Sequence, residues 1–518
     1  MLAAVRSAAL VGIDAYDVIV EVDAAPGLPQ WTIVGLAAGA VRESRERVGA
    51  ALLNSGFDVP PRRVTVNLAP ADTKKDGTAF DLPIAIGILV ATGQLEAETI
   101  HRRLFVGELG LDGALRAMRG ALSVARHALR TGVSTLVLPP PNVGEASRVS
   151  ALALSAPQCL RDLVHELREG TLTIARANTA SSSAAMDAND FSDVVGQAGA
   201  KRALEVAAAG GHNVLLIGPP GAGKTMLARR VPSILPVLSE EEALEVIAIH
   251  SVAGVLDANS VAKGVRPFRA PHHTISSAGL IGGGPIPRPG EVSLAHNGVL
   301  FLDEMLEFPR HVLDGLRQPM EDAKVIIARA AQAVMYPARF TLIGASNPCP
   351  CGKAGHPSGA CSCAPGDVDR YAARISGPLA DRIDMHVNVG AVALRELSGA
   401  STGDSSATVR KRVEHARATQ RKRFAKARGI SCNAYASGRW LDAHTPIHGG
   451  ARSLLQTAAE RLSLSARGYH RVLKVARTIA DLEAASEVAP RHIGEALRYR
   501  PMAKSPGIAI PAVVSQEA

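Results

Sequence analysis

The 518-residue sequence contains no apolar run long enough to cross a bilayer. Its longest apolar stretch, Pro83 to Gly93, falls far short of the roughly 20 residues that a membrane-spanning helix needs. The apolar start of the chain is not typical of a signal peptide, because Asp14 and Asp17 interrupt it and residues 18–22 alternate as a strand does. We therefore expect a cytoplasmic protein with no membrane partner.

Cysteine is scarce, with six residues in the whole chain, and no repeat of 20 to 50 residues is visible. In the cytoplasm these thiols are expected to stay reduced, which excludes a disulfide framework. Cys159 and Cys432 stand alone and are expected to be packing residues. The other four form a cluster of two Cys-x-Cys pairs around His356, and four thiolates suit tetrahedral Zn²⁺. We predict a structural zinc knuckle there, with a metal-free loop of reduced thiols as the alternative. Its ligands would be Cys349, Cys351, Cys361 and Cys363.

Composition is otherwise that of a globular protein, with 47% hydrophobic and 20% charged residues. The net charge of +9 favours a polyanionic partner. Small and polar residues divide the chain into three parts. The predicted parts are residues 1–175, 191–392 and 409–518, joined by linkers at 176–190 and 393–408.

The central part contains a phosphate-binding loop between an apolar strand, Val214 to Ile217, and a helical pattern. In the pattern G-x-x-x-x-G-K-T, glycines let backbone N–H groups face phosphates, and the helix directs its positive end to the same anion. Lys224 is expected to reach the β- and γ-phosphates of ATP, and the Thr225 hydroxyl to hold Mg²⁺. The predicted nucleotide-binding residues are Gly218, Pro219, Pro220, Gly221, Ala222, Gly223, Lys224 and Thr225.

Two further strands end in polar residues that complete such a site. Residues 297–304 form an apolar strand followed by Asp303, expected to bind Mg²⁺, and Glu304, expected to polarise the attacking water. The alternative is a buried strand with two surface acids. Asn347 follows a strand at 340–343 and is expected to contact the γ-phosphate or the water, unless it only forms an Asn-Pro turn.

Four arginines are candidates for contacts to the nucleotide. Arg382 precedes a strand, as does the arginine that contacts a neighbouring subunit's γ-phosphate in oligomeric ATPases, and Arg374 is the second choice. Arg467, in the first turn of a C-terminal helix, is expected to touch the bound nucleotide, with Arg471 one turn later as its rival.

Contacts to DNA are predicted in a hairpin at residues 325–340, where Arg329 would contact the phosphate backbone in a sequence-independent way. The alternative is an ordinary surface arginine. Residues Ser276 to Gly290 form a candidate second pore loop, and we interpret His272 and His273 at its base as core histidines.

A helix is expected over residues 409–428, which contain nine Lys or Arg and one acid. Its predicted buried face comprises Val413, Ala416, Gln420 and Phe424, leaving a solvated basic surface opposite. We interpret this basic surface as solvated, with contact to phosphates as the alternative.

The N-terminal part reads as α+β, with strands at 18–22 and 64–68 and a helix over Ala40 to Leu53. Residues 75–86, 106–125 and 135–142 resemble segments of the Lon protease domain, which has a ribosomal protein S5 domain 2-like fold. The resemblance places Ala79 where the nucleophilic serine would stand and Leu122 near the position of the lysine. We therefore predict a Lon-like domain without peptidase activity.

Longer motifs, at residues 191–197, 270–284, 290–304, 347–352 and 374–384, together resemble the YifB/ComM family of magnesium-chelatase-like AAA+ proteins. The resemblance implies a multidomain α/β protein with an AAA+ core and a C-terminal helical lid. It also implies a hexameric ATPase that uses ATP and Mg²⁺ in branch migration of single-stranded or branched DNA during natural transformation. The alternative is a chelatase-type motor that remodels a protein partner.

Overall fold

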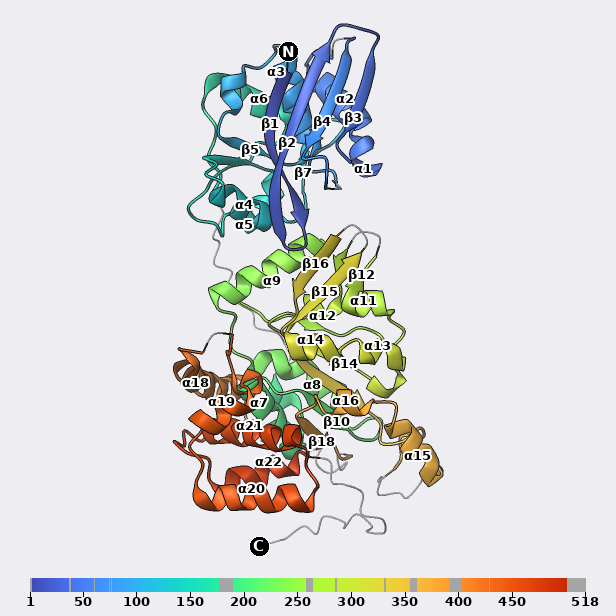
Figure 1. The fold of residues 1–518 in the computed structure, drawn as a ribbon, viewed down its shortest axis with the longest axis vertical. Helices are drawn as coiled ribbons and strands as arrows, with labels where there is room; N and C mark the ends of the chain where they lie inside the picture. The colour runs from blue at the N-terminus through green and yellow to red at the C-terminus, as the bar shows by residue number, and fades with distance from the viewer. Residues whose placement is uncertain are drawn as a thin grey trace.

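The computed structural model describes most of the chain, and Figure 1 shows three parts stacked along its long axis, with the C-terminal helices opposite the N-terminal sheets. Most of both predicted linkers lies outside the described residues, as does His356. No helix in the described part is long and apolar enough to span a membrane. The described residues are 2–36, 39–59, 61–73, 75, 77–176, 190–257, 264–284, 287–329, 332–354, 361–391, 403–427 and 429–500.

The N-terminal part is α+β, as predicted. One sheet has the order β1-β2-β4-β3, and a second, parallel sheet has the order β5-β8-β9. The helix predicted over Ala40 to Leu53 is two helices, because the helical pattern is interrupted at Glu43. The strands are β1 (Leu2–Val11), β2 (Asp14–Ala25), β3 (Gln30–Val34), β4 (Arg63–Ala69), β5 (Arg103–Phe105), β6 (Glu108–Leu109), β7 (Leu115–Arg116), β8 (Thr135–Val137) and β9 (Ala153–Ser155). The helices are α1 (Gly39–Arg42), α2 (Ser44–Asn54), α3 (Asp81–Ala91), α4 (Ala121–Arg130), α5 (Val143–Ala146) and α6 (Leu160–Glu169).

The apolar run near residue 83 forms the core helix of this part. Every residue of α3 is buried, which explains why its sequence lacks the polar stripe of a surface helix. A side chain at Gly87 would lie 2.5 Å from the Val22 side chain, so α3 sits directly on the first sheet.

The central part is built on a five-stranded parallel sheet with the order β11-β14-β17-β10-β18. The strand before the phosphate-binding loop, β10, therefore lies between β17 and β18. Its strands are β10 (Val214–Ile217), β11 (Phe268–Arg269), β14 (Val299–Leu302), β17 (Thr341–Ser346) and β18 (Met385–Asn388), beside hairpins β12 (Gly282–Gly283) with β13 (Arg288–Pro289) and β15 (Lys324–Arg329) with β16 (Gln332–Pro337). The helices are α7 (Ala198–Gly210), α8 (Lys224–Ile234), α9 (Glu240–Ala253), α11 (Ser277–Ile281), α12 (Glu291–Leu294), α13 (Arg310–Asp314), α14 (Arg317–Asp322), α15 (Pro365–Ala372) and α16 (Gly377–Ala380).

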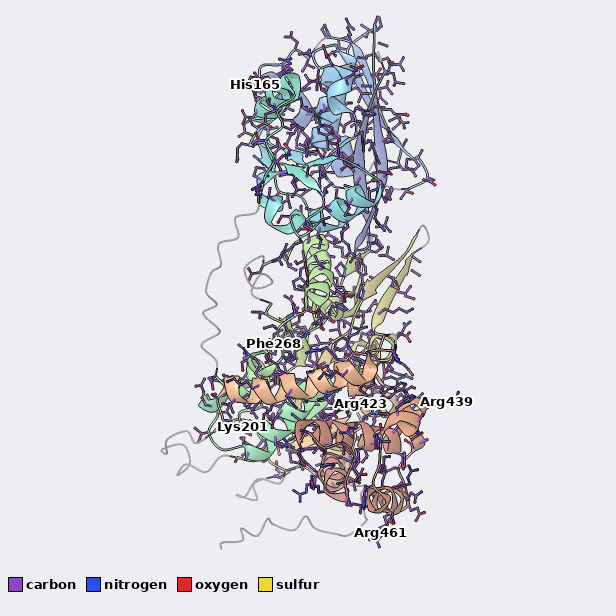
Figure 2. All side chains as sticks on the ribbon, turned by 90° about the vertical axis from the view of Figure 1, so that its left-hand side faces the viewer. His165, Lys201, Phe268, Arg423, Arg439 and Arg461 are labelled. Carbon is purple, nitrogen blue, oxygen red and sulfur yellow. The ribbon has the colours of Figure 1, made fainter. Side chains whose placement is uncertain are left out.

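The C-terminal part is helical, and its first helix, α18, crosses the view in Figure 2 and packs on α7 and α8 of the central part as well as on α21. All four residues predicted for the buried face of α18 are buried. The helices are α18 (Ser406–Phe424), α19 (Gly438–His444), α20 (Gly449–Arg461), α21 (Ala466–Leu482) and α22 (Pro490–Arg498).

Four arginines that flank the buried face of α18 bind groups of the same chain, whereas Lys411, His415 and Lys422 on the opposite face are exposed, as predicted. Arg410 and Arg417 donate to the carbonyls of Ser233 and Ala208, and Arg412 and Arg423 pair with carboxylates. Those carboxylates belong to Glu205 and Asp481. These four arginines therefore fix α18 to its own chain.

The N-terminal part contacts the central part at two places. Leu122, at the start of α4, is fully buried in an apolar cluster that includes Val246 and Ile247 of α9. The Gly120 N–H donates to the Ser251 hydroxyl at 2.7 Å, which fixes α4 to α9. The β1–β2 turn meets the β15–β16 hairpin, where a side chain on Gly12 would lie 2.7 Å from Val334.

Candidate nucleotide-binding site

The phosphate-binding loop connects β10 to α8, as the sequence predicts. Gly221 and Gly223 have φ of +78° and +85°, in the left-handed region that favours glycine. At Gly218 a side chain would lie 2.1 Å from the Val389 carbonyl oxygen, so the loop passes too close to the end of β18 for any other residue. The loop therefore curls in front of the N-terminus of α8, where N–H groups without helical partners can bind an anion.

The Lys224 side chain lies inside this loop. Its ammonium donates to the carbonyls of Gly218 at 2.6 Å and Pro219 at 2.9 Å, and to Asn347 Oδ1 at 3.2 Å. Burial lowers the pKa of Lys224 below its usual value, and the nearby carboxylates of Asp303 and Glu304 oppose that change. The Lys224 ammonium is thus held at the loop, where its N–H groups can donate hydrogen bonds to a phosphate oxygen.

Thr225 and Asp303 meet across the site. The Thr225 hydroxyl donates to Asp303 Oδ2 at 2.8 Å, which places two oxygen ligands of the kind Mg²⁺ prefers side by side. Glu304 follows in a left-handed conformation with φ of +49°, and its N–H donates to Asp303 Oδ1 at 3.0 Å. This donation orients the Asp303 carboxylate toward Thr225.

Asn347 completes the group because of the strand order. Since β17 lies between β10 and β14, with Ile217 opposite Ser346 and Leu302 opposite Gly344, the three strands end at one edge of the sheet. Ligands bind at such carboxyl ends of parallel strands. The resulting pocket has a volume of about 420 Å³ and is lined by Pro220, Gly221, Ala222, Gly223, Lys224, Thr225, Met226, Asp303, Glu304, Ala345, Ser346 and Asn347.

Gln197, which the sequence reasoning missed, also supports the loop. Its side-chain amide donates to the Ala222 carbonyl at 3.1 Å and to the Gly390 carbonyl at 2.6 Å. Gln197 directly precedes α7 and has a left-handed backbone with φ of +54°, and its side chain does not cap that helix. The only sequence signal is its place in the motif at residues 191–197.

Three family models together match most of the chain. Residues 190–397 match the model described as magnesium chelatase, subunit ChlI, residues 20–142 match subunit ChlI of Mg-chelatase, and residues 403–500 match the subunit ChlI C-terminal model. The YifB protein of Salmonella typhimurium is 44% identical over 96% of this chain and 97% of its own length. Competence protein ComM of Haemophilus influenzae is 42% identical over 97% of this chain and 98% of its own length.

The chain belongs to the YifB/ComM family of magnesium-chelatase-like proteins. The 38 kDa magnesium-chelatase subunit of Rhodobacter capsulatus is a more distant relative, 29% identical over 30% of this chain and 50% of its own length. Membership implies an AAA+ ATPase that uses ATP and Mg²⁺, and AAA+ proteins of this kind form oligomers.

In this YifB/ComM protein Arg382 and Arg467 lie away from the pocket. Among the described residues, neither lines it. The Arg382 guanidinium binds the carboxylate of Glu321, and Arg467 Nη2 lies 3.9 Å from the other oxygen of that carboxylate. The hydrogen bond from Arg382 lowers the pKa of Glu321. Arg467 is 63% exposed, so its side chain is accessible at the start of α21.

The rival arginines are engaged within the chain. Arg374 donates to the Leu306 carbonyl and to Glu307 Oε2, both at 2.9 Å. Arg471 is largely buried, with Nε 3.5 Å from Asp384 Oδ1.

Asp384 joins the C-terminal helices to the base of the parallel sheet. It accepts a hydrogen bond from the Asn213 N–H at 3.1 Å and lies 3.6 Å from His212 Nδ1. His212 in turn lies 2.8 Å from the Thr478 hydroxyl on α21. Burial favours the neutral acid, but His212 and Arg471 lower the pKa of Asp384 to about 2.

The interpretation of His272 and His273 as core histidines is wrong. His272 is exposed and its ring lies tilted against that of His273, with ring centroids 4.1 Å apart. His273 Nδ1 lies 3.8 Å from Glu304 Oε2. His273 therefore lies beside Glu304 at the edge of this pocket, because the short β11 strand ends beside β14.

The hairpin predicted before the Asn347 strand is present as β15 and β16, with Arg329 opposite Gln332 beside the turn. The Arg329 side chain lies outside the described part of the structure. Ile326 and Met335 are paired across the hairpin and are 48% and 57% exposed.

The four predicted zinc ligands also come together, with their sulfur atoms within 4.8 Å of one another.

Proposed function

We propose that this protein is an ATP-driven ring motor that acts on DNA, in branch migration or strand separation during natural transformation. The main support for ATP hydrolysis is that Lys224, Thr225, Asp303 and Asn347 converge on one pocket. The DNA substrate is supported by the relative named competence protein ComM and by the net charge of +9.

In this proposal the pocket binds the triphosphate of ATP. Lys224 exchanges its bonds to the Gly218 and Pro219 carbonyls for bonds to phosphate oxygens, so no new buried charge is left unpaired. Thr225 and Asp303 would hold Mg²⁺, which would neutralise charge on the phosphates. The backbone N–H groups at the start of α8 complete the anion site.

Hydrolysis requires an oriented water and stabilisation of the charge that develops while the γ-phosphoryl group passes to that water and ADP leaves. Glu304 polarises the water, and Asn347 orients it or contacts the γ-phosphate. Arg382 acts in trans on the pocket of the neighbouring subunit, which is why the functional unit is a ring, expected to be a hexamer. Arg467 contacts the nucleotide from the C-terminal helices, whereas the buried contact of Arg471 with Asp384 suits a structural role.

DNA contact is assigned to the β15–β16 hairpin. Ile326 and Met335 form an exposed apolar pair on which bases can pack, and Arg329 is next to the turn for a phosphate contact. Most arginines of α18 are already bound within the chain, so this helix is the weaker candidate. The hairpin directly precedes β17, the strand that leads to Asn347. ATP-dependent changes in the pocket can therefore be transmitted to the hairpin through this strand.

Residues 1–175 are proposed as a Lon-like domain without peptidase activity, residues 191–392 as the AAA+ core and residues 409–518 as the lid. The residue expected near the family lysine position, Leu122, is packed against α9. This domain therefore serves as a support for the motor or a grip on its substrate, through its contact with the hairpin at Gly12.

The test is steady-state ATP hydrolysis with and without single-stranded or forked DNA, at two salt concentrations. The proposal expects stimulation by DNA that falls as salt rises, because phosphate contacts release counterions. A magnesium-chelatase-type motor that remodels a protein partner is the second candidate, favoured by the family models. Turnover that DNA leaves unchanged, with no DNA binding at low salt, would favour this second candidate.

A further inference from the structure

Four cysteine thiols converge immediately after the strand that carries Asn347. The sulfur of Cys349 lies 3.4 Å from that of Cys351 and 3.8 Å from that of Cys361, and the Cys351 and Cys361 sulfurs are 3.6 Å apart. With Cys363, all four sulfur atoms lie within 4.8 Å of one another. We call this group the four-cysteine cluster.

These distances suit a single tetrahedral metal ion. With a Zn–S bond of about 2.3 Å, neighbouring sulfurs of a ZnS₄ tetrahedron are about 3.8 Å apart. Two separate disulfides would instead require two sulfur pairs at about 2.0 Å. Sulfur-only ligation in tetrahedral geometry selects Zn²⁺ or iron over the oxygen-loving ions Mg²⁺ and Ca²⁺.

Backbone N–H groups around the cluster are arranged to stabilise negative sulfur. The Ala354 N–H donates to Cys349 Sγ at 3.2 Å, and the N–H groups of Lys353 and Ser362 donate to Cys351 Sγ. Backbone N–H groups that donate to the sulfur ligands orient them and offset the excess charge of four thiolates on one divalent ion. Cys349 itself is fully buried.

The cluster also lies against the nucleotide pocket. Gly352, at the end of the Cys349–Gly352 turn, has φ of +77°, and a side chain there would lie 2.8 Å from the Pro220 ring. The same position is 3.9 Å from the Asn347 side chain. The turn is closed by the Gly352 N–H, which donates to the Cys349 carbonyl at 2.9 Å.

The geometry points to one Zn²⁺ in the four-cysteine cluster, which fixes the turn that supports both the phosphate-binding loop and Asn347. The described residues between Ser346 and Pro365 form no helix or strand, so the Zn²⁺ would cross-link a segment that lacks regular backbone hydrogen bonding. Removal of the metal releases Gly352 from Pro220 and weakens nucleotide binding. The metal site stands on the cysteine geometry, and only its effect on nucleotide rests on the proposed ATPase.

The first experiment measures metal content of the full-length protein by plasma mass spectrometry after reduction and reconstitution with ZnCl₂. The result expected is about one Zn²⁺ per chain, lost in the Cys361→Ser/Cys363→Ser double variant and retained in Cys159→Ser. In the Co²⁺-loaded protein, intense visible d–d bands of a tetrahedral tetrathiolate are expected. Absence of stoichiometric zinc, retention of zinc by the double variant, or iron in its place would overturn the assignment.

The second experiment measures MgATP affinity by calorimetry on the same proteins. The double variant is expected to bind MgATP at least tenfold more weakly than Cys159→Ser. Gly352→Ala keeps all four ligands and its zinc, yet is expected to weaken MgATP binding because the new methyl group meets Pro220. Retention of zinc by this variant shows that it folds.

If both variants bind MgATP as the unmodified protein does, the supporting role is wrong. If the unmodified protein itself fails to bind MgATP, the proposed ATPase fails while the zinc measurement still decides the metal site.

Discussion

Arg382 binds Glu321 of its own chain, and the same carboxylate lies 3.9 Å from Arg467. Two arginines proposed to reach nucleotide are therefore held at one acidic side chain, outside the pocket. A trans-acting Arg382 has to leave Glu321 when a neighbouring subunit presents ATP. Glu321 is more than half exposed, so this pair is weak enough to exchange.

Arg382→Ala is expected to lower ATP turnover by about 10³-fold, because an arginine finger stabilises transition-state charge. MgATP affinity is expected to remain near that of the unmodified protein. Glu321→Gln is the matched control, since it removes the same ion pair but leaves the finger. If Glu321→Gln loses turnover as severely as Arg382→Ala, the pair is structural and the finger assignment fails.

Mixed rings test whether Arg382 acts in trans. Subunits with Arg382→Ala are combined with Glu304→Gln subunits, which carry an intact Arg382 but an inactive pocket. Turnover is expected to reappear in the mixture, because Arg382 of one subunit completes the pocket of the other. Mixtures that form rings but remain inactive would contradict the trans assignment.

Glu304→Gln alone is expected to keep MgATP binding and to lower turnover by about 10²- to 10⁴-fold, the range for loss of a positioned proton acceptor. Equilibrium binding and phosphate release are measured on the same preparation. Glu307→Gln is the control, because Glu307 binds Tyr371 and Arg374 and does not line the pocket. Equal loss of turnover in both variants would contradict the role of Glu304.

Thr225→Ala is expected to raise the Mg²⁺ concentration needed for half-maximal turnover, because it removes one of two adjacent oxygen ligands. Thr225→Ser keeps the hydroxyl and is expected to keep the Mg²⁺ requirement of the unmodified protein. Turnover measured across a Mg²⁺ titration distinguishes the two. An unchanged requirement in Thr225→Ala would remove Thr225 from the metal site.

Asp384→Asn is expected to destabilise the docking of the C-terminal helices. The pKa of Asp384 is lowered from 3.8 to about 2, a shift worth about 2 kcal/mol of stability. Because the folded-state pKa is depressed, this contribution is fully present above pH 3.8 and is lost as the pH falls through about 2. Thermal unfolding of the variant is therefore expected to occur at lower temperature at pH 7 and at pH 5. A variant as stable as the unmodified protein at pH 7 would contradict the assignment.

The pocket residues could be predicted from the sequence because the geometry of the pocket is set by local sequence patterns. Glycine spacing between a strand and a helix sets the phosphate-binding loop, and polar residues directly after apolar strands meet at one sheet edge. The structure places Lys224, Thr225, Asp303 and Asn347 together in the way this pattern predicts. The helical face of α18 was also predictable, because burial follows the helical period.

Long-range partners were not predictable, since they leave no periodic pattern. Nothing near Arg412 or Arg423 indicates that Glu205 and Asp481 come from other helices to bind them. Nothing in the sequence around His272 indicates that the short β11 strand ends close to Glu304 and leaves the ring exposed. Leu122 is apolar because it packs on α9, a contact made about 120 residues away in sequence.

The most direct test of a DNA motor is displacement of a labelled strand from a forked or three-stranded DNA by the full-length protein with MgATP. We predict displacement that requires ATP hydrolysis, so that Glu304→Gln binds the DNA but releases no strand. ATP hydrolysis without strand displacement on any of these substrates, and without stimulation by DNA, would contradict the account.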